Sequence, residues 1–158
     1  MNGLTCCFIG HRTINETEKL KAQIYEIVEN LIVKEKVGTF LFGSKSRFND
    51  LCYETVTEIK EKYPHIKRVY VRAEYPFIKE DYKTYLLEKY EDTYYPEKII
   101  GAGKSVYIER NFEMIKNSDF CVIYNNEQTA PKHRKSGTQA AADYAEGQKK
   151  KIIEVMYR

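Results

Sequence analysis

The stretch Leu4 to Arg12, LTCCFIGHR, limits the folds open to this chain more than any other segment. It is a short apolar run that ends at a Gly-His-Arg tripeptide, which is typical of a strand buried on both faces of a parallel sheet. From Asn15 to Lys34 apolar residues recur at helical spacing behind an acidic first turn, so this segment is predicted to be an amphipathic helix. A buried strand, a glycine turn and a helix together indicate the start of a parallel α/β sheet.

The same alternation of strand and helix continues along the chain. Further strands are predicted at Val37–Phe42, Lys67–Arg72, Asp119–Tyr124 and 149–157. Further helices are predicted at Arg47–Tyr63, Ile78–Glu91, Glu109–Ser118 and after Ser136. The strand from Lys67 is expected near the sheet edge, and Gly147 is expected to end the last helix in a left-handed conformation. We therefore predict an α/β protein with a single-domain, Rossmann-like fold over residues 1–158, in which a mostly parallel sheet of about five strands carries helices on both faces.

A tyrosine-rich insert at about residues 74–106 breaks this rhythm. It contains Pro76, Pro96 and a Gly-Ala-Gly loop, and it is expected to pass over the ends of the strands. Its tyrosines suit a surface layer in which the rings pack and the hydroxyl groups stay in contact with water. A lid or a dimer contact is the alternative interpretation.

Composition narrows the range of partners and locations. The net charge is only +3 from 26 basic and 23 acidic side chains, so nucleic-acid binding is not expected. Four cysteines lack the paired spacing of a zinc site and are predicted to be reduced core residues; they are Cys6, Cys7, Cys52 and Cys121. We expect no metal site from these residues. No export signal or long apolar run is visible, so we expect a cytoplasmic protein that does not enter a membrane.

Candidate ligand-binding residues stand where predicted strands end. In open α/β sheets, ligands bind outside the carboxyl ends of the strands. The first strand ends at Gly10, His11 and Arg12, and the guanidinium of Arg12 could bind a phosphate as a planar fork. His11 is as well explained by a structural hydrogen bond. The second strand ends at the tripeptide Gly43, Ser44 and Lys45, which offers a point charge for a phosphate.

Helix starts supply the remaining candidates. Asn49 and Asp50 lie in the first turn after the second strand, where Asp50 could accept a ribose hydroxyl or simply complement the helix dipole. Arg110 and Asn111 are predicted to open the helix before the fourth strand. The turn that opens the last helix has free amides for an anion, although its hydroxyls could equally act as N-caps; it consists of Ser136, Gly137 and Thr138. The basic residues Lys132 to Lys135 precede this turn.

Taken together, these segments resemble the YpsA-like branch of the SLOG superfamily. The resemblance covers nearly the whole chain and rests on FIGHR, the glycine-ended second strand, Arg110-Asn111, the Asn-Ser-Asp sequence at 117–119 and Ser136-Gly137-Thr138. It implies a compact domain that binds a nucleotide or a nucleotide-derived ligand, such as an ADP-ribose-type molecule of anti-phage signalling. Relatives include LOG phosphoribohydrolases and the DNA-processing protein DprA. The resemblance is also compatible with a homo-oligomer, and a bound phosphate could bring magnesium with it.

The resemblance also raises the question of catalysis. In the phosphoribohydrolase relatives a glutamate serves the cleavage of the glycosidic bond, and Ala141 stands at that position here. A methyl group cannot transfer protons, so a protein that senses or sequesters its ligand is favoured over a hydrolase. An N-glycosidase that uses Glu54 or Asp50 as its carboxylate is one alternative. A protein-interaction module built on the tyrosine-rich insert is the other.

Overall fold

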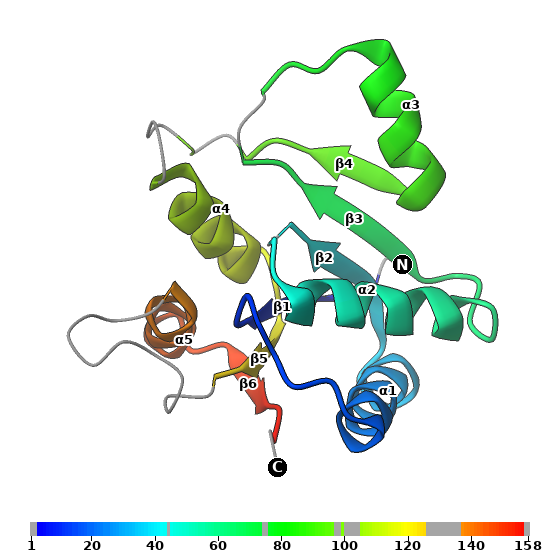
Figure 1. The fold of residues 1–158 in the computed structure, drawn as a ribbon, viewed down its shortest axis with the longest axis vertical. Coiled ribbons are helices and arrows are strands. Elements are labelled where there is room, and N and C mark those ends of the chain that lie inside the picture. Colours follow the sequence, from blue (N-terminus) through cyan, green and yellow to red (C-terminus); the bar gives the residue numbers. More distant parts are fainter. Residues whose placement is uncertain are drawn as a thin grey trace.

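The computed structural model describes residues 3–43, 45–73, 76–96, 99, 105–125 and 137–156. Its elements in chain order are β1 (Leu4–Gly10), α1 (Glu18–Val33), β2 (Val37–Phe42), α2 (Arg47–Lys60), β3 (Lys67–Val71), α3 (Glu80–Lys89), β4 (Asp92–Tyr94), α4 (Ser105–Lys116), β5 (Phe120–Tyr124), α5 (Gly137–Gly147) and β6 (Lys151–Glu154). Figure 1 shows the helices arranged around a central sheet.

All strands of the sheet are parallel, in the order β4-β3-β2-β1-β5-β6. The chain proceeds outward from β1 to β4 and then returns to the other side of β1, so the order reverses between β1 and β5. This doubly wound arrangement confirms the predicted α/β, Rossmann-like fold, with six strands where about five were expected. The carboxyl ends of all the strands lie along the same end of the sheet, which is called the carboxyl edge below. Their amino ends lie along the opposite end, which is called the amino edge.

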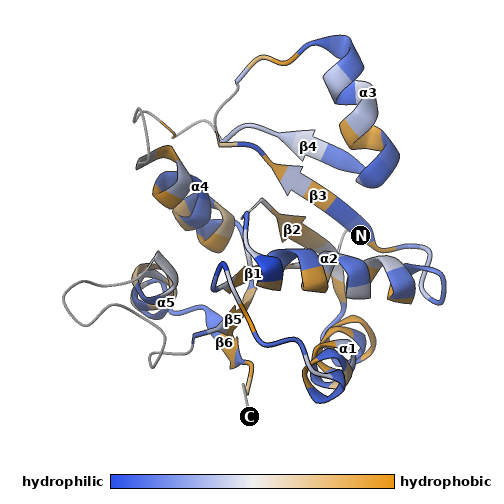
Figure 2. Ribbon diagram, in the orientation of Figure 1, coloured by the Kyte–Doolittle hydropathy of each residue, from blue (hydrophilic) through white to orange (hydrophobic). Residues whose placement is uncertain are grey.

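Each face of the sheet is covered by its own apolar core. Helices α1 and α2 pack on the face that carries Phe8, Phe40 and Phe42. The Phe8 ring stacks with both of the others, and its centroid lies 5.9 Å from that of Phe40 and 5.2 Å from that of Phe42. On the other face, Met114 and Ile115 of α4 and the alanines of α5 pack against the central strands. Figure 2 shows hydrophobic residues on the central strands and on the inner side of α1, whereas α3 is mostly hydrophilic. The four cysteines are free and buried, as predicted.

The structure corrects the sequence-based prediction at three places. The tyrosine-rich insert contributes β4, which pairs with β3, so the sheet edge lies one strand further out than the pattern indicated. Helix α4 begins at Ser105 rather than near Glu109, so Arg110 lies in its second turn and not at its opening. The left-handed residue after α5 is Lys149, with φ of 57°, and not Gly147.

None of the helices formed by the described residues combines the length and the apolar character that crossing a membrane requires. No group of three or more His, Cys, Asp and Glu side chains in the same part of the chain could hold a metal ion.

Candidate functional site

Gly10, at the carboxyl end of β1, has a packing role. A Cβ atom at this position would lie 2.3 Å from the Phe48 ring. Phe48 is fully buried in the first turn of α2, so the glycine allows this turn to approach the sheet closely. The backbone N–H of Arg47 donates to the carbonyl of Arg12 at 2.9 Å, which fixes the tip of β1 against the start of α2.

Gly43, at the end of β2, makes room for an arginine. A Cβ atom here would lie 2.7 Å from the carbonyl oxygen of Val71 and 3.0 Å from Cδ of Arg110. Arg110 is only 3% exposed, although it carries a full charge. Its Nε donates to Oδ1 of Asn111 at 3.0 Å, so the neighbouring amide helps to orient the guanidinium. The sequence singled out both Arg110 and Asn111, but the helix that carries them begins earlier than predicted.

The loop between Gly43 and α2 is held by side chains of its own helix. Ser46 is the N-cap of α2, and its Oγ accepts from the backbone N–H of Asn49 at 3.0 Å. The side chain of Asn49 is buried, and its Oδ1 lies 3.5 Å from the backbone nitrogen of Gly43. Asn49 thus holds the end of β2 in place from the protein interior. This positioning role is compatible with a ligand bound on the outer side.

Arg110 and Lys45 share a small pocket at the carboxyl ends of β2 and β3. It has a volume of about 60 Å³ and is called the carboxyl-edge pocket below. The described residues that line it are Lys45, Tyr70, Arg72, Ala73, Tyr82, Tyr107 and Arg110. They come from the loop after β2, from β3 and its end, from α3 and from α4. The lining thus includes three basic side chains and three tyrosines, and none of its described members is acidic.

Aromatic and polar contacts set the positions of these basic groups. Nζ of Lys45 lies 5.9 Å from the centroid of the Tyr107 ring, and Cζ of Arg110 lies 5.8 Å from the same centroid. Both cations therefore lie within the range of a cation–π contact with one ring. Arg72 donates to Oγ1 of Thr93 at 3.2 Å and to the carbonyl of Pro76 at 3.4 Å. A lining with three basic side chains and no acidic one among its described members gives the pocket a positive potential, which attracts an anion.

The other predicted residues are not among the described residues that line the pocket. The His11 ring packs edge-on against Tyr124 with centroids 6.0 Å apart, and Arg12 is exposed. At the start of α5, Thr138 is buried and Gly137 is exposed, and none of the described residues places an atom within 4 Å of where the Cβ of Gly137 would be. Ser44, Ser136 and the basic residues 132–135 lie outside the described residues.

The two candidate carboxylates have different surroundings. Glu54 is exposed and pairs with Arg47 at 3.4 Å, and Arg47 also holds Glu16. Partial burial raises the pKa of Asp50; the charge of Arg47 lowers it, whereas the charges of Glu54 and Glu16 raise it further. Neither carboxylate lines the carboxyl-edge pocket. The structure therefore does not bring either one together with Lys45 and Arg110.

Several polar residues at this edge were not singled out from the sequence. Arg72 follows β3 directly, so the rule that ligands bind at strand ends would have found it. Tyr82 and Tyr107 could not be distinguished from the other tyrosines by pattern. A further chain of side-chain hydrogen bonds follows β5: Asn125 donates to Gln139 at 2.7 Å, and Gln139 donates to Asp143 at 2.8 Å. Oδ1 of Asn125 is buried and has no hydrogen-bond partner among the described residues.

A scan against protein-family models gave no match, and a search of curated proteins also gave none. The resemblance to the SLOG superfamily therefore stays a prediction, and the geometry of the site has to carry the functional argument.

Proposed function

We propose that the protein binds a nucleotide or a nucleotide-derived ligand, such as an ADP-ribose-type molecule, at the carboxyl ends of its strands, and that it senses or sequesters this ligand. The observation that carries the proposal is the convergence of Lys45, Arg72 and Arg110 on one pocket. The ligand class itself is the one implied by the resemblance to the YpsA-like branch of the SLOG superfamily.

The size of the pocket indicates which part of such a ligand it would hold. A volume of about 60 Å³ is roughly twice the 30 Å³ that one water molecule occupies in the liquid, so the pocket suits a single anionic group. The remainder of the ligand would extend outside it, along the tips of β1 and β5. There it would pass His11 and Arg12, which follow β1 in the sequence, and the start of α5. The amides at the start of α5 would favour a second phosphate.

A thermal-shift panel of nucleotides, NAD, ADP-ribose and its cyclic forms tests this proposal. A ligand present at a hundred times its dissociation constant stabilises a folded protein by about 2.7 kcal/mol, which gives a clear shift. Calorimetry then measures the affinity for Lys45→Ala, which removes one of the three cations. We expect affinity to fall about tenfold, because a hydrogen bond to a charged group contributes about 1.5–3 kcal/mol.

Lys151→Ala is the matched control. Lys151 is also an exposed lysine beside an aromatic ring, with Nζ 5.3 Å from the Phe120 centroid, but it lies at the amino edge of the sheet. The control should bind the ligand as the unmodified chain does. No shift with any member of the panel, or equal affinity in both variants, would contradict the proposal. Release of free base from a nucleotide, abolished by Asp50→Asn or Glu54→Gln, would replace binding by glycosidic cleavage.

A further inference from the structure

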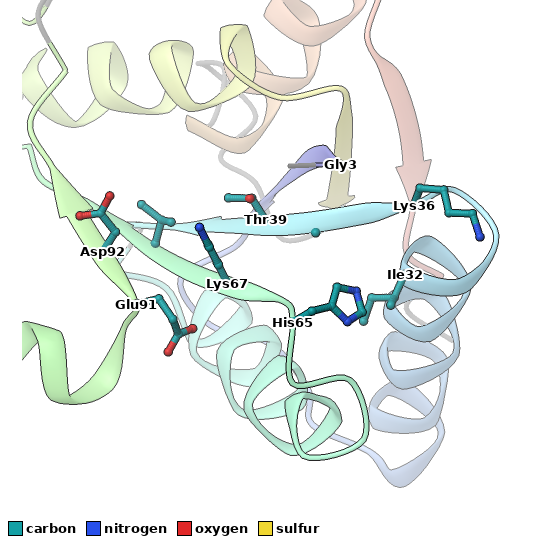
Figure 3. A pocket seen from close by; sticks show the side chains of 10 residues that line it. Gly3, Ile32, Lys36, Thr39, His65, Lys67, Glu91 and Asp92 are labelled. Carbon is teal, nitrogen blue, oxygen red and sulfur yellow. The ribbon is translucent and has the colours of Figure 1, made fainter. Parts of the chain in front are cut away.

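A second, larger hollow lies at the opposite edge of the sheet, where the strands begin. It has a volume of about 670 Å³ and is called the amino-edge hollow below. This volume falls within the range of about 300–1,000 Å³ that is typical of small-molecule sites. Figure 3 shows its lining, with Asp92, Lys67 and Thr39 toward one end and His65 and Ile32 toward the other.

The hollow exists because the helices leave part of one sheet face uncovered. Thr39 and Lys67 are direct partners on β2 and β3, and Asp92 of β4 is paired with Val69. Side chains alternate between faces, so these residues lie on the face of Val69, which belongs to the core under α4 and α5. That core consists of residues nearer the carboxyl ends of the strands, whereas the hollow is lined mostly by residues nearer their amino ends.

Two opposite charges face this hollow. Lys67 lies two residues before Val69, the partner of Asp92. With about 3.3 Å of rise per residue and about 4.8 Å between strands, the Cα atoms of Lys67 and Asp92 are about 8 Å apart. Because Lys67 and Asp92 stand this close on one face, a single small ligand that carries both charges could contact both side chains.

The other charged groups of the lining are already engaged. Glu91 receives two hydrogen bonds from the side chain of Arg68, at 2.7 and 3.0 Å. Nζ of Lys36 donates to the carbonyl of Val33 at 3.1 Å, at the end of α1, where a cation complements the helix dipole. Lys36 keeps its positive charge, because a carbonyl does not neutralise it. The remaining charged pair of the lining is Lys67 and Asp92, which are of opposite sign. Oδ1 of Asp92 accepts from the backbone N–H of Thr93 at 2.8 Å, and a ligand would be bound by its other carboxylate oxygen.

The opposite end of the hollow carries one large apolar residue, Ile32, beside His65 and Lys36 (Figure 3). Gly38, which carries no side chain, lines the hollow as well. The pairing of β1 with β2 shifts register here, from Leu4 opposite Val37 to Thr5 opposite Thr39, so Gly38 is passed over. Irregularities of this kind are found next to functional sites more often than elsewhere in sheets.

We propose that the amino-edge hollow binds a small zwitterion of the amino-acid type. Its ammonium group lies at Asp92, and its carboxylate lies at Lys67 beside the hydroxyl of Thr39. Its apolar side chain extends over Gly38 toward Ile32 and His65. This site is separate from the carboxyl-edge pocket and does not depend on the nucleotide proposal.

The test uses the full chain and a panel of the twenty free amino acids and the dipeptides Gly-Phe and Phe-Gly. Saturation-transfer NMR finds the members that bind, and calorimetry measures the affinity of the tightest one. The same amino acid is then offered with its amine acetylated or with its carboxylate converted to an amide. Each modification should weaken binding to the unmodified chain about tenfold, which corresponds to the loss of one charged contact.

Charge-neutralising variants then assign each contact to one residue. Lys67→Gln should weaken binding of the free amino acid about tenfold but leave binding of its amide unchanged, because the amide no longer has a carboxylate. Asp92→Asn should behave in the same way with the acetylated form. Lys151→Gln, on the same edge but outside the hollow, should bind as the unmodified chain does. The proposal is overturned if no panel member binds at millimolar concentration, or if Lys67→Gln and Asp92→Asn retain full affinity.

Discussion

The two edges of this sheet are built from the same strands but offer different chemistry. At the carboxyl edge, α4 and the insert converge on the ends of β2 and β3 and enclose about 60 Å³ among three basic side chains. At the amino edge, the helices leave about 670 Å³ open, and the lining carries side chains of both signs, Lys67 and Asp92 among them. The two sites thus differ both in the sign of their charges and in the volume they offer, and the candidate ligands differ accordingly. The carboxyl edge also depends on close packing, because the Phe48 ring fills the space beside Gly10.

The largest effect on stability is expected at a glycine of the carboxyl edge. In Gly10→Ala the new methyl group would meet the Phe48 ring at 2.3 Å, so the start of α2 has to move away from the sheet. Overpacking of this kind costs about 1–3 kcal/mol, and we expect the upper part of this range because Phe48 is fully buried. Urea unfolding monitored by circular dichroism measures the change.

Gly137→Ala is the matched control for this substitution. Gly137 lies at the same edge, yet no atom of the described part of the chain lies within 4 Å of its Cβ position, and its backbone is not left-handed. This variant should be as stable as the parent, or more stable by about 0.4–1 kcal/mol, because alanine restricts the unfolded chain. If Gly10→Ala unfolds at the same urea concentration as Gly137→Ala, the carboxyl edge does not depend on close packing at β1.

A carboxylate of the amino edge should give the next largest effect. Glu91 accepts from the side chain of Arg68 and from its backbone N–H at 2.8 Å. Burial by itself raises the pKa of Glu91, but these hydrogen bonds outweigh burial and hold the pKa below its usual value. Glu91→Gln should therefore lower the free energy of unfolding at pH 7 by about 1–2 kcal/mol.

The pH dependence of this loss has a definite sign. Because the pKa of Glu91 is lower in the folded state, its contribution is complete above the unfolded pKa and disappears as pH falls through the folded pKa. The difference between the variant and its parent should thus shrink on acidification, as urea unfolding between pH 7 and pH 3 can show. Glu88→Gln, an exposed change on α3, should stay within about 0.5 kcal/mol at every pH. A constant difference for Glu91→Gln would contradict the ion pair.

At the carboxyl edge, the contribution of the Asp50 charge to stability should have the opposite sign to that of Glu91. Desolvation raises its pKa in the folded state, so its charge opposes folding at neutral pH. Asp50→Asn should raise the free energy of unfolding at pH 7 by an amount on the order of 0.3 kcal/mol, since solvent screens a group this exposed. This gain should vanish as pH falls below the unfolded pKa of Asp50. Destabilisation at pH 7 would show that Asp50 mainly complements the dipole of α2.

These contrasts also show how far the sequence could predict the molecule. The buried strands and the helices α1 and α2 followed from apolar periodicity, because each buries one continuous stripe. Strand β4 did not, because three residues, Asp92–Tyr94, are too few to show an alternation. The role of Gly10 also escaped prediction: a glycine at a strand tip suggests a ligand, and only the position of Phe48 reveals that a ring occupies the space.

The candidate site was predictable in part for the same physical reasons. Lys45 was identified because it follows the glycine that ends the second strand, and Arg110 was identified because it was predicted to open a helix. Their meeting in one pocket depends on the earlier start of α4, which places Arg110 against Gly43. Tyr82 and Tyr107 reach the pocket through the arrangement of α3 and α4, and no local pattern records that arrangement.

The smallest effect on stability, and the sharpest test of the carboxyl edge, is expected from two neighbouring tyrosines of α3. Tyr82 and Tyr85 stack with centroids 6.3 Å apart and are 38% and 49% exposed, but only Tyr82 lines the carboxyl-edge pocket. Because both side chains lie on the surface, Tyr82→Ala and Tyr85→Ala should unfold within about 0.5 kcal/mol of each other. In calorimetry with the nucleotide that binds most tightly, Tyr82→Ala should lose about threefold to tenfold in affinity, because an aromatic contact contributes about 0.5–1.5 kcal/mol. Tyr85→Ala should lose nothing. Equal losses would instead assign the effect to the tyrosine pair as a whole, and with it a binding role to the exposed face of α3 rather than to the pocket.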